Sequence, residues 1–409
     1  MPKSIKNIYL YLVTGNTLAA SFIWGINTIF LLDAGLTNFQ AFLANAFFTL
    51  GQVIFEVPTG IVADTWGRRR SYLLGTVTLA LSTALYLLMW KIEGPFWGWA
   101  VSSLLLGLGF TFFSGAVEAW LVDALKATNF EGKLEGVFAK GQIFGGGAML
   151  LGSVLGGVIA QFTSLGVPYI LRSAVLLINF AVAFFLMKDL GFNPKKSDKP
   201  LLEMKKIFSS SIENGLKKPA IRWVMLAAPF TVGVSFYIFY ALQPFLLKLY
   251  GNEKAYGIAG LVAALVASAQ IAGGFAAPYI GKLFTRRTTA MLSGTFFTGI
   301  MLVLVSIISN FYIIIALIFF WGLIFAALMP IRQTYLNELI PSQQRATVLS
   351  FDSLMGSSGG IIAQPILGKV ADVSSYSASY FVAAIFQLGA LPFIYLARKE
   401  KPPSDFSEK

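Results

Sequence analysis

Two acids and two bases are among the ionisable side chains inside otherwise apolar stretches and lie at corresponding places: Glu118 and Lys140 in the first half of the chain, and Arg332 and Asp352 in the second. A charge inside an apolar span is costly and by default marks a functional position. The positions correspond between the halves with acid and base exchanged, so each half is predicted to contain one acid–base pair. Two interpretations are open. The pairs hold neighbouring helices together, or Glu118 or Asp352 exchanges a proton when its partner moves away, because losing the partner raises the pKa of a carboxylate.

Conventional catalytic groups are missing from the sequence. The chain contains no Cys and no His, which excludes disulfides, thiolate nucleophiles, thiolate metal sites and Ser–His triads. It also has no G-x-x-x-x-G-K-[ST] phosphate-binding loop. We therefore expect neither an enzyme nor a nucleotide-driven pump, and no cofactor or metal. Any protons carried at neutral pH would have to bind carboxylates.

The elements that position these charges are predicted to be membrane-spanning helices. Of the 409 residues, 56% are hydrophobic and 12% are charged, whereas soluble domains contain about 25% charged residues. A helix of about 20 apolar residues crosses a bilayer, and windows of that length predict an all-α membrane protein with twelve spans. The predicted spans are 7–32, 38–62, 71–90, 96–121, 135–162, 167–187, 221–247, 256–280, 288–309, 312–336, 347–370 and 377–397.

The basic residues predict how these spans are oriented. With both termini in the cytoplasm, most of the 31 Lys and Arg residues fall in cytoplasmic loops, and the outer side receives only Lys91, Lys248, Lys254 and Lys369. Positive charge gathers on the cytoplasmic side of membrane proteins. This accounts for the net charge of +12 without nucleic acid as a partner. It predicts a multi-pass protein of the cytoplasmic or plasma membrane.

A lysine-rich polar stretch divides the spans six and six. We expect a first bundle at 1–187, a basic cytoplasmic linker at 188–220, a second bundle at 221–397 and a cytoplasmic tail at 398–409. The halves resemble each other weakly, and two six-span halves in the same orientation are typical of transporters built from parallel repeats. We expect a monomer surrounded by lipid.

The loop between the second and third spans carries the most specific motif of the chain, G-I-V-A-D-T-W-G-R-R-R at 60–70. It resembles the major facilitator superfamily signature G-x-L-A-D-x-x-G-R-K/R and lies in the expected loop. The run at 345–350 resembles the drug-efflux-like branch of that superfamily. The resemblance implies two pseudo-symmetric six-helix bundles and secondary transport by alternating access.

The same resemblance implies a latch on the cytoplasmic side. Asp64 would lie at the N-terminus of the eleventh span, where exposed amides favour negative charge, and Arg68 would bridge Asp64 to Asp123. Gly60 and Gly67 permit a tight turn. The alternative is that the arginines of this loop only set the orientation of the chain in the membrane.

Two positions depart from the drug/proton antiporter pattern. Ser103 stands where that branch usually has an arginine, and Ser153 stands in place of a proline. Both departures argue against a direct assignment to proton-coupled drug antiport.

Polar and aromatic side chains at helical spacing predict a substrate cavity. Asn45, Gln52 and Glu56 share one face of the second span, which should avoid lipid. The resemblance places the first, fourth, seventh and tenth spans around a central cavity. The other predicted lining residues are Asn16, Trp24, Asn27, Phe236, Tyr237, Tyr240, Gln243, Trp321 and Phe325. Such a lining suits an amphiphilic or aromatic small molecule, although aromatic residues also face lipid or form interfacial belts.

Three functions remain open from the sequence. The first is proton-coupled export of amphiphilic or aromatic small molecules, and the second is import of a nutrient or organic anion on the same fold. The third is a polytopic membrane receptor without transport. Arg172, early in the sixth span, is expected to extend outward to the lipid headgroups, with anion binding as the alternative.

Overall fold

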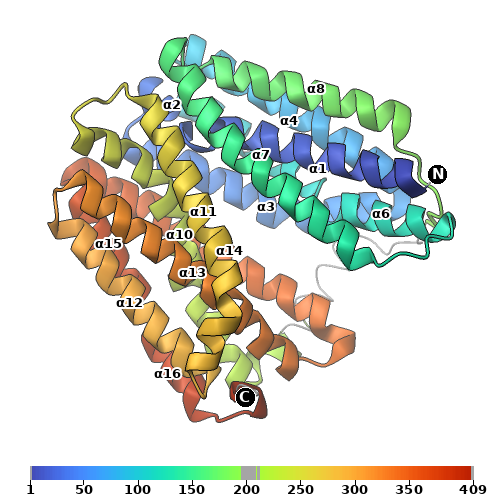
Figure 1. Cartoon of the computed structure of the whole chain (residues 1–409). Coiled ribbons are helices and arrows are strands. Elements are labelled where there is room, and N and C mark those ends of the chain that lie inside the picture. Colours follow the sequence, from blue (N-terminus) through green and yellow to red (C-terminus); the bar gives the residue numbers. More distant parts are fainter. Residues whose placement is uncertain (1, 195–208, 210–211, 407–409) are drawn as a thin grey trace. The chain divides into compact units, whose positions relative to one another are not determined.

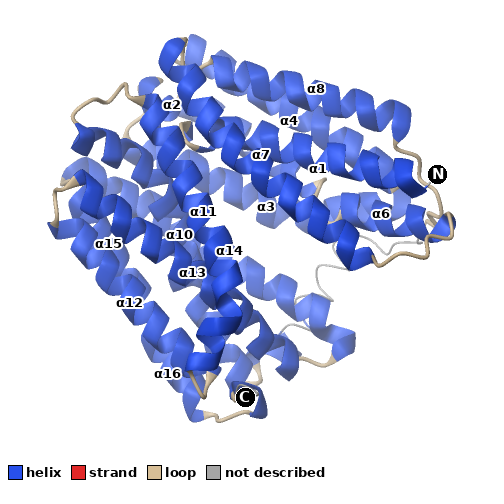
Figure 2. Cartoon of the chain, viewed as in Figure 1, coloured by secondary structure: helices blue, strands red, loops and turns tan. Residues whose placement is uncertain are grey.

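The computed structural model describes residues 2–194, 209 and 212–406. These residues are almost entirely helical, and the part described contains no strand beyond one isolated bridge between Arg286 and Phe406 (Figure 2). The helices of the first half are α1 (Pro2–Trp24), α2 (Asn27–Asp33), α3 (Asn38–Trp66), α4 (Arg68–Lys91), α5 (Phe96–Thr111), α6 (Ala116–Ala127), α7 (Leu134–Phe162) and α8 (Val167–Leu186). Those that follow are η1 (Ile212–Leu216), α10 (Pro219–Tyr250), α11 (Tyr256–Leu283), α12 (Arg287–Ile307), α13 (Phe311–Leu339), η2 (Ser342–Gln344), α14 (Arg345–Val373), α15 (Tyr376–Leu388), α16 (Leu391–Lys399) and η3 (Pro403–Asp405).

Each predicted span corresponds to a helix or a helix pair. Within the described residues, ten helices are long and apolar enough to cross a membrane, and the pair α1 and α2, bent by 46°, raises the number to eleven. The predicted span 347–370 is α14, which is long enough at 29 residues but more polar, with Asp352, Lys369 and Asp372 among many Gly and Ser residues. A helix of this composition crosses a membrane when its polar side packs against protein.

The chain divides into two compact units. Unit 1 comprises Met1–Leu36, Phe47–Glu203 and Lys254–Ala264, and unit 2 comprises Thr37–Ala46, Met204–Glu253 and Leu265–Lys409. The units thus differ from the predicted halves in two short segments, because the first residues of α3 group with unit 2 and those of α11 with unit 1. Residues 195–208, 210 and 211 of the predicted linker at 188–220 lie outside the described residues.

The two units repeat one packing scheme. In unit 1, α1 packs against α7, and α4 packs against α5 and α8; in unit 2, α10 packs against α14, and α12 packs against α13 and α15 (Figure 1). Glycine allows the closest approach in each unit, because a Cβ at Gly156 would collide with the Phe22 carbonyl, and one at Gly359 with the Pro229 carbonyl. Small residues bring membrane helices this close. Equivalent helices therefore pack in the same way in the two units, in line with the weak sequence repeat.

Candidate functional site

A pocket in unit 1 brings together two of the carboxylates singled out from the sequence. It has a volume of about 430 Å³. Glu56 comes from α3 and Glu118 from the first turn of α6. The other residues that line it are Gln52, Phe110, Thr111, Phe113, Ser114 and Gly115. Two acids, an amide and two phenylalanines therefore share one recess.

A break in the predicted fourth span creates this pocket. The span 96–121 is not one continuous helix, because α5 ends at Thr111 and α6 begins at Ala116. Gly115 caps α6 with a φ of +67°, a left-handed conformation that suits glycine. Ser114 in the break donates a hydrogen bond of 2.6 Å to Glu56 Oε1, which ties the break to α3. The helix start beside Glu118 favours a negative charge.

The acid–base pair predicted for the first half, Glu118 with Lys140, is not formed in the described structure. Glu118 and Lys140 are both exposed, and no ion pair joins them among the contacts of the described residues. Their pairing stays a prediction.

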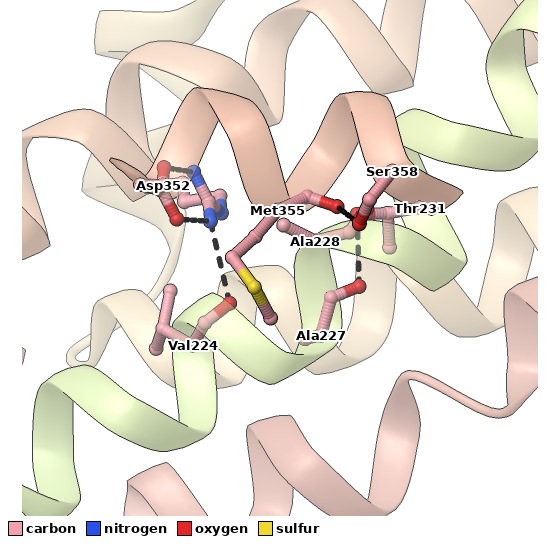
Figure 3. Close-up of polar contacts among 8 residues, drawn as sticks. Val224, Ala227, Ala228, Thr231, Asp352, Met355 and Ser358 are labelled. Atoms are coloured by element: carbon pink, nitrogen blue, oxygen red, sulfur yellow. Dashed lines mark hydrogen bonds and ion pairs between the residues drawn. The ribbon is translucent and has the colours of Figure 1, made fainter. Parts of the chain in front are cut away.

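In unit 2, Arg332 of α13 and Asp352 of α14 form a two-point ion pair. The guanidinium donates to both carboxylate oxygens, at 2.6 Å and 2.5 Å. A third donor contact, of 3.3 Å, reaches the Val224 carbonyl of α10 (Figure 3). The side chains are 12% and 10% exposed, so the pair is well shielded. Parallel charge-assisted hydrogen bonds of this kind are strong and fix geometry.

A second, much smaller pocket, of about 40 Å³, adjoins this ion pair. Phe325 and Arg332, both predicted from the tenth span, line it together with Met329 and Gln387. Trp321 lies one turn away from Phe325 and stacks on it, with ring centroids 5.3 Å apart. Trp321 itself is 2% exposed and donates to Gln387 Oε1 at 3.4 Å.

Several predicted cavity residues make hydrogen bonds inside their own unit. Asn16 Oδ1 accepts from Tyr72 at 2.8 Å and from Asn179 at 2.9 Å. Asn27 Oδ1 accepts from Tyr169 at 3.1 Å. Tyr237 is buried and donates to Ser379. Of the remainder, Trp24, Phe236 and Tyr240 are partly buried, and Asn45 and Gln243 are buried. A place in a substrate cavity remains a prediction for all of these residues.

The predicted latch loop has a defined local structure. Asp64 and Arg68 form an ion pair of 2.5 Å. Gly67 adopts a φ of +107°, which only glycine adopts readily. The tight turn expected at Gly60 is wrong, because Gly60 lies inside α3, where an added Cβ would meet no atom within 4 Å. The bridge from Arg68 to Asp123 and the contact of Asp64 with the eleventh span stay predictions.

Asp189, which the sequence did not single out, holds the start of α4. Its Oδ1 accepts the Arg69 N–H at 2.9 Å, and its Oδ2 occupies the space that a Cβ at Gly67 would need. The Arg69 guanidinium in turn donates to the carbonyl of Phe184 at 2.5 Å, near the end of α8. Burial raises the pKa of the Asp189 carboxyl above its ordinary value, and the Arg69 N–H and the neighbouring arginines oppose this rise.

Unit 2 repeats this capping arrangement. Asp405, which is fully buried, accepts the Thr288 N–H at 2.8 Å and the Thr288 hydroxyl at 2.9 Å, at the start of α12. Arg287 donates to the Ser404 carbonyl and pairs with Glu338 at 2.6 Å. The described part of the predicted tail, residues 398–406, is therefore packed against the bundle through these residues. A signal for both caps is an acid shortly after the last span of each half.

The outward orientation expected for Arg172 is wrong. Arg172 is 1% exposed and donates to Thr83 Oγ1 at 3.1 Å and to the Ala19 carbonyl at 3.4 Å. Asn179, seven residues later on the same face of α8, could have signalled a polar face turned inward.

Comparisons with known proteins agree with this architecture. The Major Facilitator Superfamily profile matches residues 10–308 and 253–409. An uncharacterized MFS-type transporter, MJ1560 of Methanocaldococcus jannaschii, is 21% identical over 97% of this chain and 100% of its own length. The multidrug resistance protein MdtG of Proteus mirabilis is 27% identical over 80% of each chain. The crystal structure of nucleoside transporter NupG superposes with a TM-score of 0.78 at 10% identity, over 96% of this chain and 98% of that one; this likeness concerns the fold alone.

Proposed function

Since the chain belongs to the major facilitator superfamily and is a transporter rather than an enzyme, we propose that it exports amphiphilic or aromatic small molecules in exchange for protons. Transport would proceed by alternating access. Similarity to proteins named for multidrug resistance supports export as the direction of transport and amphiphilic or aromatic compounds as the substrate class.

The unit 1 pocket is the observation that carries this proposal. Phe110 and Phe113 offer apolar area, while Gln52, Glu56 and Glu118 offer polar contacts within the same pocket of about 430 Å³. A few polar groups in an apolar recess fix the orientation of a ligand that is held mainly by area. Two carboxylates favour basic compounds over organic anions, which is the argument against the import of an anion.

Glu118 is the better candidate for the coupling proton. Asp352 is held by two short hydrogen bonds to Arg332, so protonating it would give up a charge-assisted pair inside the bundle. Glu118 is exposed to its pocket, and a bound cation and a proton would compete for the same carboxylate. Such competition would couple release of the cation to uptake of a proton.

We further propose that the protein lies in the cytoplasmic or plasma membrane with both termini inside. The excess of basic residues in the loops predicted to be cytoplasmic supports this orientation. The Asp64 loop would then lie on the cytoplasmic side, where it would close the inner end of the transport path.

Reconstitution into liposomes tests the proposal. Ethidium, an aromatic cation, should accumulate when an imposed proton gradient drives exchange, and Glu118→Gln should abolish the accumulation without loss of folded protein. Glu135→Gln, which removes an exposed acid outside the pocket, is the matched control and should leave transport intact.

Three results would overturn parts of the proposal. Ethidium movement regardless of the sign of the gradient would exclude proton coupling. Gradient-driven uptake of a polar anion, with no effect of aromatic cations, would favour import. Ligand binding without any flux would favour a receptor.

A further inference from the structure

The end of α14 holds the beginning of α3. Asp372, the second-last residue of α14, accepts the Asn38 N–H at 2.9 Å and the Phe39 N–H at 2.8 Å. These are the first two residues of α3, whose amides have no partner within the helix. One exposed carboxylate thus satisfies two free amides at a helix N-terminus, where negative charge is favoured.

Neighbouring contacts fit around this cap. The Tyr376 hydroxyl donates to Asn38 Oδ1, and the Phe42 ring lies 4.7 Å from the ring of Tyr237. A Cβ at Gly368 would lie 2.8 Å from Phe42 Cδ2 and 2.9 Å from the Asn38 carbonyl oxygen, so α14 approaches α3 closely here. For these reasons the first residues of α3 belong to unit 2, while the rest of the helix belongs to unit 1.

The two helices carry matching features at their opposite ends. Both α3 and α14 are 29 residues long, and each has an acid within its last three residues, Asp64 in α3 and Asp372 in α14. The family resemblance assigns Asp64 to the N-terminus of α14 in one state of the transporter. The cap observed on α3 is the reverse arrangement, with α14 supplying the acid and α3 the N-terminus.

We propose that Asp372 and the N-terminus of α3 form an outer latch that alternates with the Asp64 latch during transport. The proposal rests on the proposed alternating-access function. A helix of 29 residues is about 43 Å long, so a tilt of α3 against α14 that closes one end opens the other. Each latch therefore stabilises the conformation in which the opposite end is open.

Distance measurements between spin labels test the outer latch. The chain has no Cys, so paired cysteines can be introduced without first removing native ones. Glu93→Cys with Ser309→Cys reports on the predicted outer side, and Glu131→Cys with Ser342→Cys reports on the inner side; all four positions are exposed. Both pairs are measured in liposomes without substrate.

Removing Asp372 and removing Asp64 should shift the ratio of outward-open to inward-open protein in opposite directions. Asp372→Ala should increase the outward-open to inward-open ratio about fivefold, the effect of losing a typical helix cap. The outer pair would then move apart and the inner pair closer. Asp64→Ala should shift the ratio the other way, and the double variant should return towards the wild-type ratio. Asp372→Asn keeps an acceptor without the charge and should give a smaller shift.

Glu253→Gln is the matched control, because it removes an exposed acid near Tyr376 without touching the Asp372 contacts with α3. An equal shift in this control would assign the effect to charge alone and overturn the latch. Unchanged distances in both Asp372 variants, or a shift in the same direction as Asp64→Ala, would overturn it as well. The measurement needs no substrate, so failure of the ethidium assay with the expected shifts would reject the export proposal and leave the latch standing.

Discussion

Replacing Asp352 by Ala should destabilise the second bundle by about 3–5 kcal/mol, the usual cost of removing one partner of a buried ion pair. Arg332 would lose both short hydrogen bonds and keep only its 3.3 Å contact with the Val224 carbonyl. Its side chain is 12% exposed, so water compensates little for the lost partner. For a bundle of about 190 residues, this corresponds to a fall in Tm of about 6–20 °C.

The double variant Arg332→Met with Asp352→Leu separates the net contribution of the ion pair to stability from the cost of leaving one buried charge unpaired. Apolar residues of similar volume often replace a buried ion pair without loss of stability, so the double variant should recover most of the lost Tm. Thermal unfolding in detergent, followed by tryptophan fluorescence, measures all three proteins. A single variant as stable as the wild type, or a double variant as unstable as the single one, would refute the reasoning. Gradient-driven ethidium transport by the folded double variant would in turn exclude Asp352 as the proton carrier.

Three further predictions concern the capped helix starts. Gly67→Ala should cost about 1–3 kcal/mol of stability through its left-handed φ and its contact with Asp189, whereas Gly60→Ala, with open space around it, should be tolerated in the same thermal assay. Asp405→Ala should cost about 1–3 kcal/mol by leaving a buried amide without an acceptor, and a truncation after Phe406, which keeps the cap, should unfold at the wild-type temperature. Because burial raises the pKa of Asp189, the folded protein holds this proton more tightly than the unfolded chain. The contribution of Asp189 to the free energy of unfolding should therefore fall as the pH rises from the ordinary pKa of an aspartate through the raised pKa. In Asp189→Asn, the free energy of unfolding should depend less on pH within that window.

The positions of the spans could be predicted because hydropathy is local. The predicted span 135–162 is α7 at Leu134–Phe162, and 167–187 is α8 at Val167–Leu186. Breaks within spans were missed because they depend on single residues. Gly115 interrupts the fourth span through a positive φ, and no window average records it.

Site residues could be predicted where a charge stood out in an apolar run, or where polar and aromatic residues recurred at helical spacing, as for Gln52 and Phe325. Arg332 and Asp352 were found in the first way and are paired in the structure. Asp189 and Asp405 were missed because they lie in polar segments, where an acid is ordinary until the chain brings it to a helix start. Arg172 was misjudged because burial of an arginine depends on acceptors from other helices, here Thr83 and Ala19.

The two aspartate caps impose an order on biosynthesis. Asp189 follows its target Arg69 by 120 positions, and Asp405 follows Thr288 by 117. The ribosome therefore delivers the cap on α4 before most of the second bundle exists, whereas α12 waits for residue 405. At about 5–20 residues per second, these two deliveries are separated by about 10–40 s. In the last part of that interval, about 6–23 s for the 117 residues from Thr288 to Asp405, α12 has an open N-terminus while the first bundle can already close, and chaperones and proteases would encounter this state first.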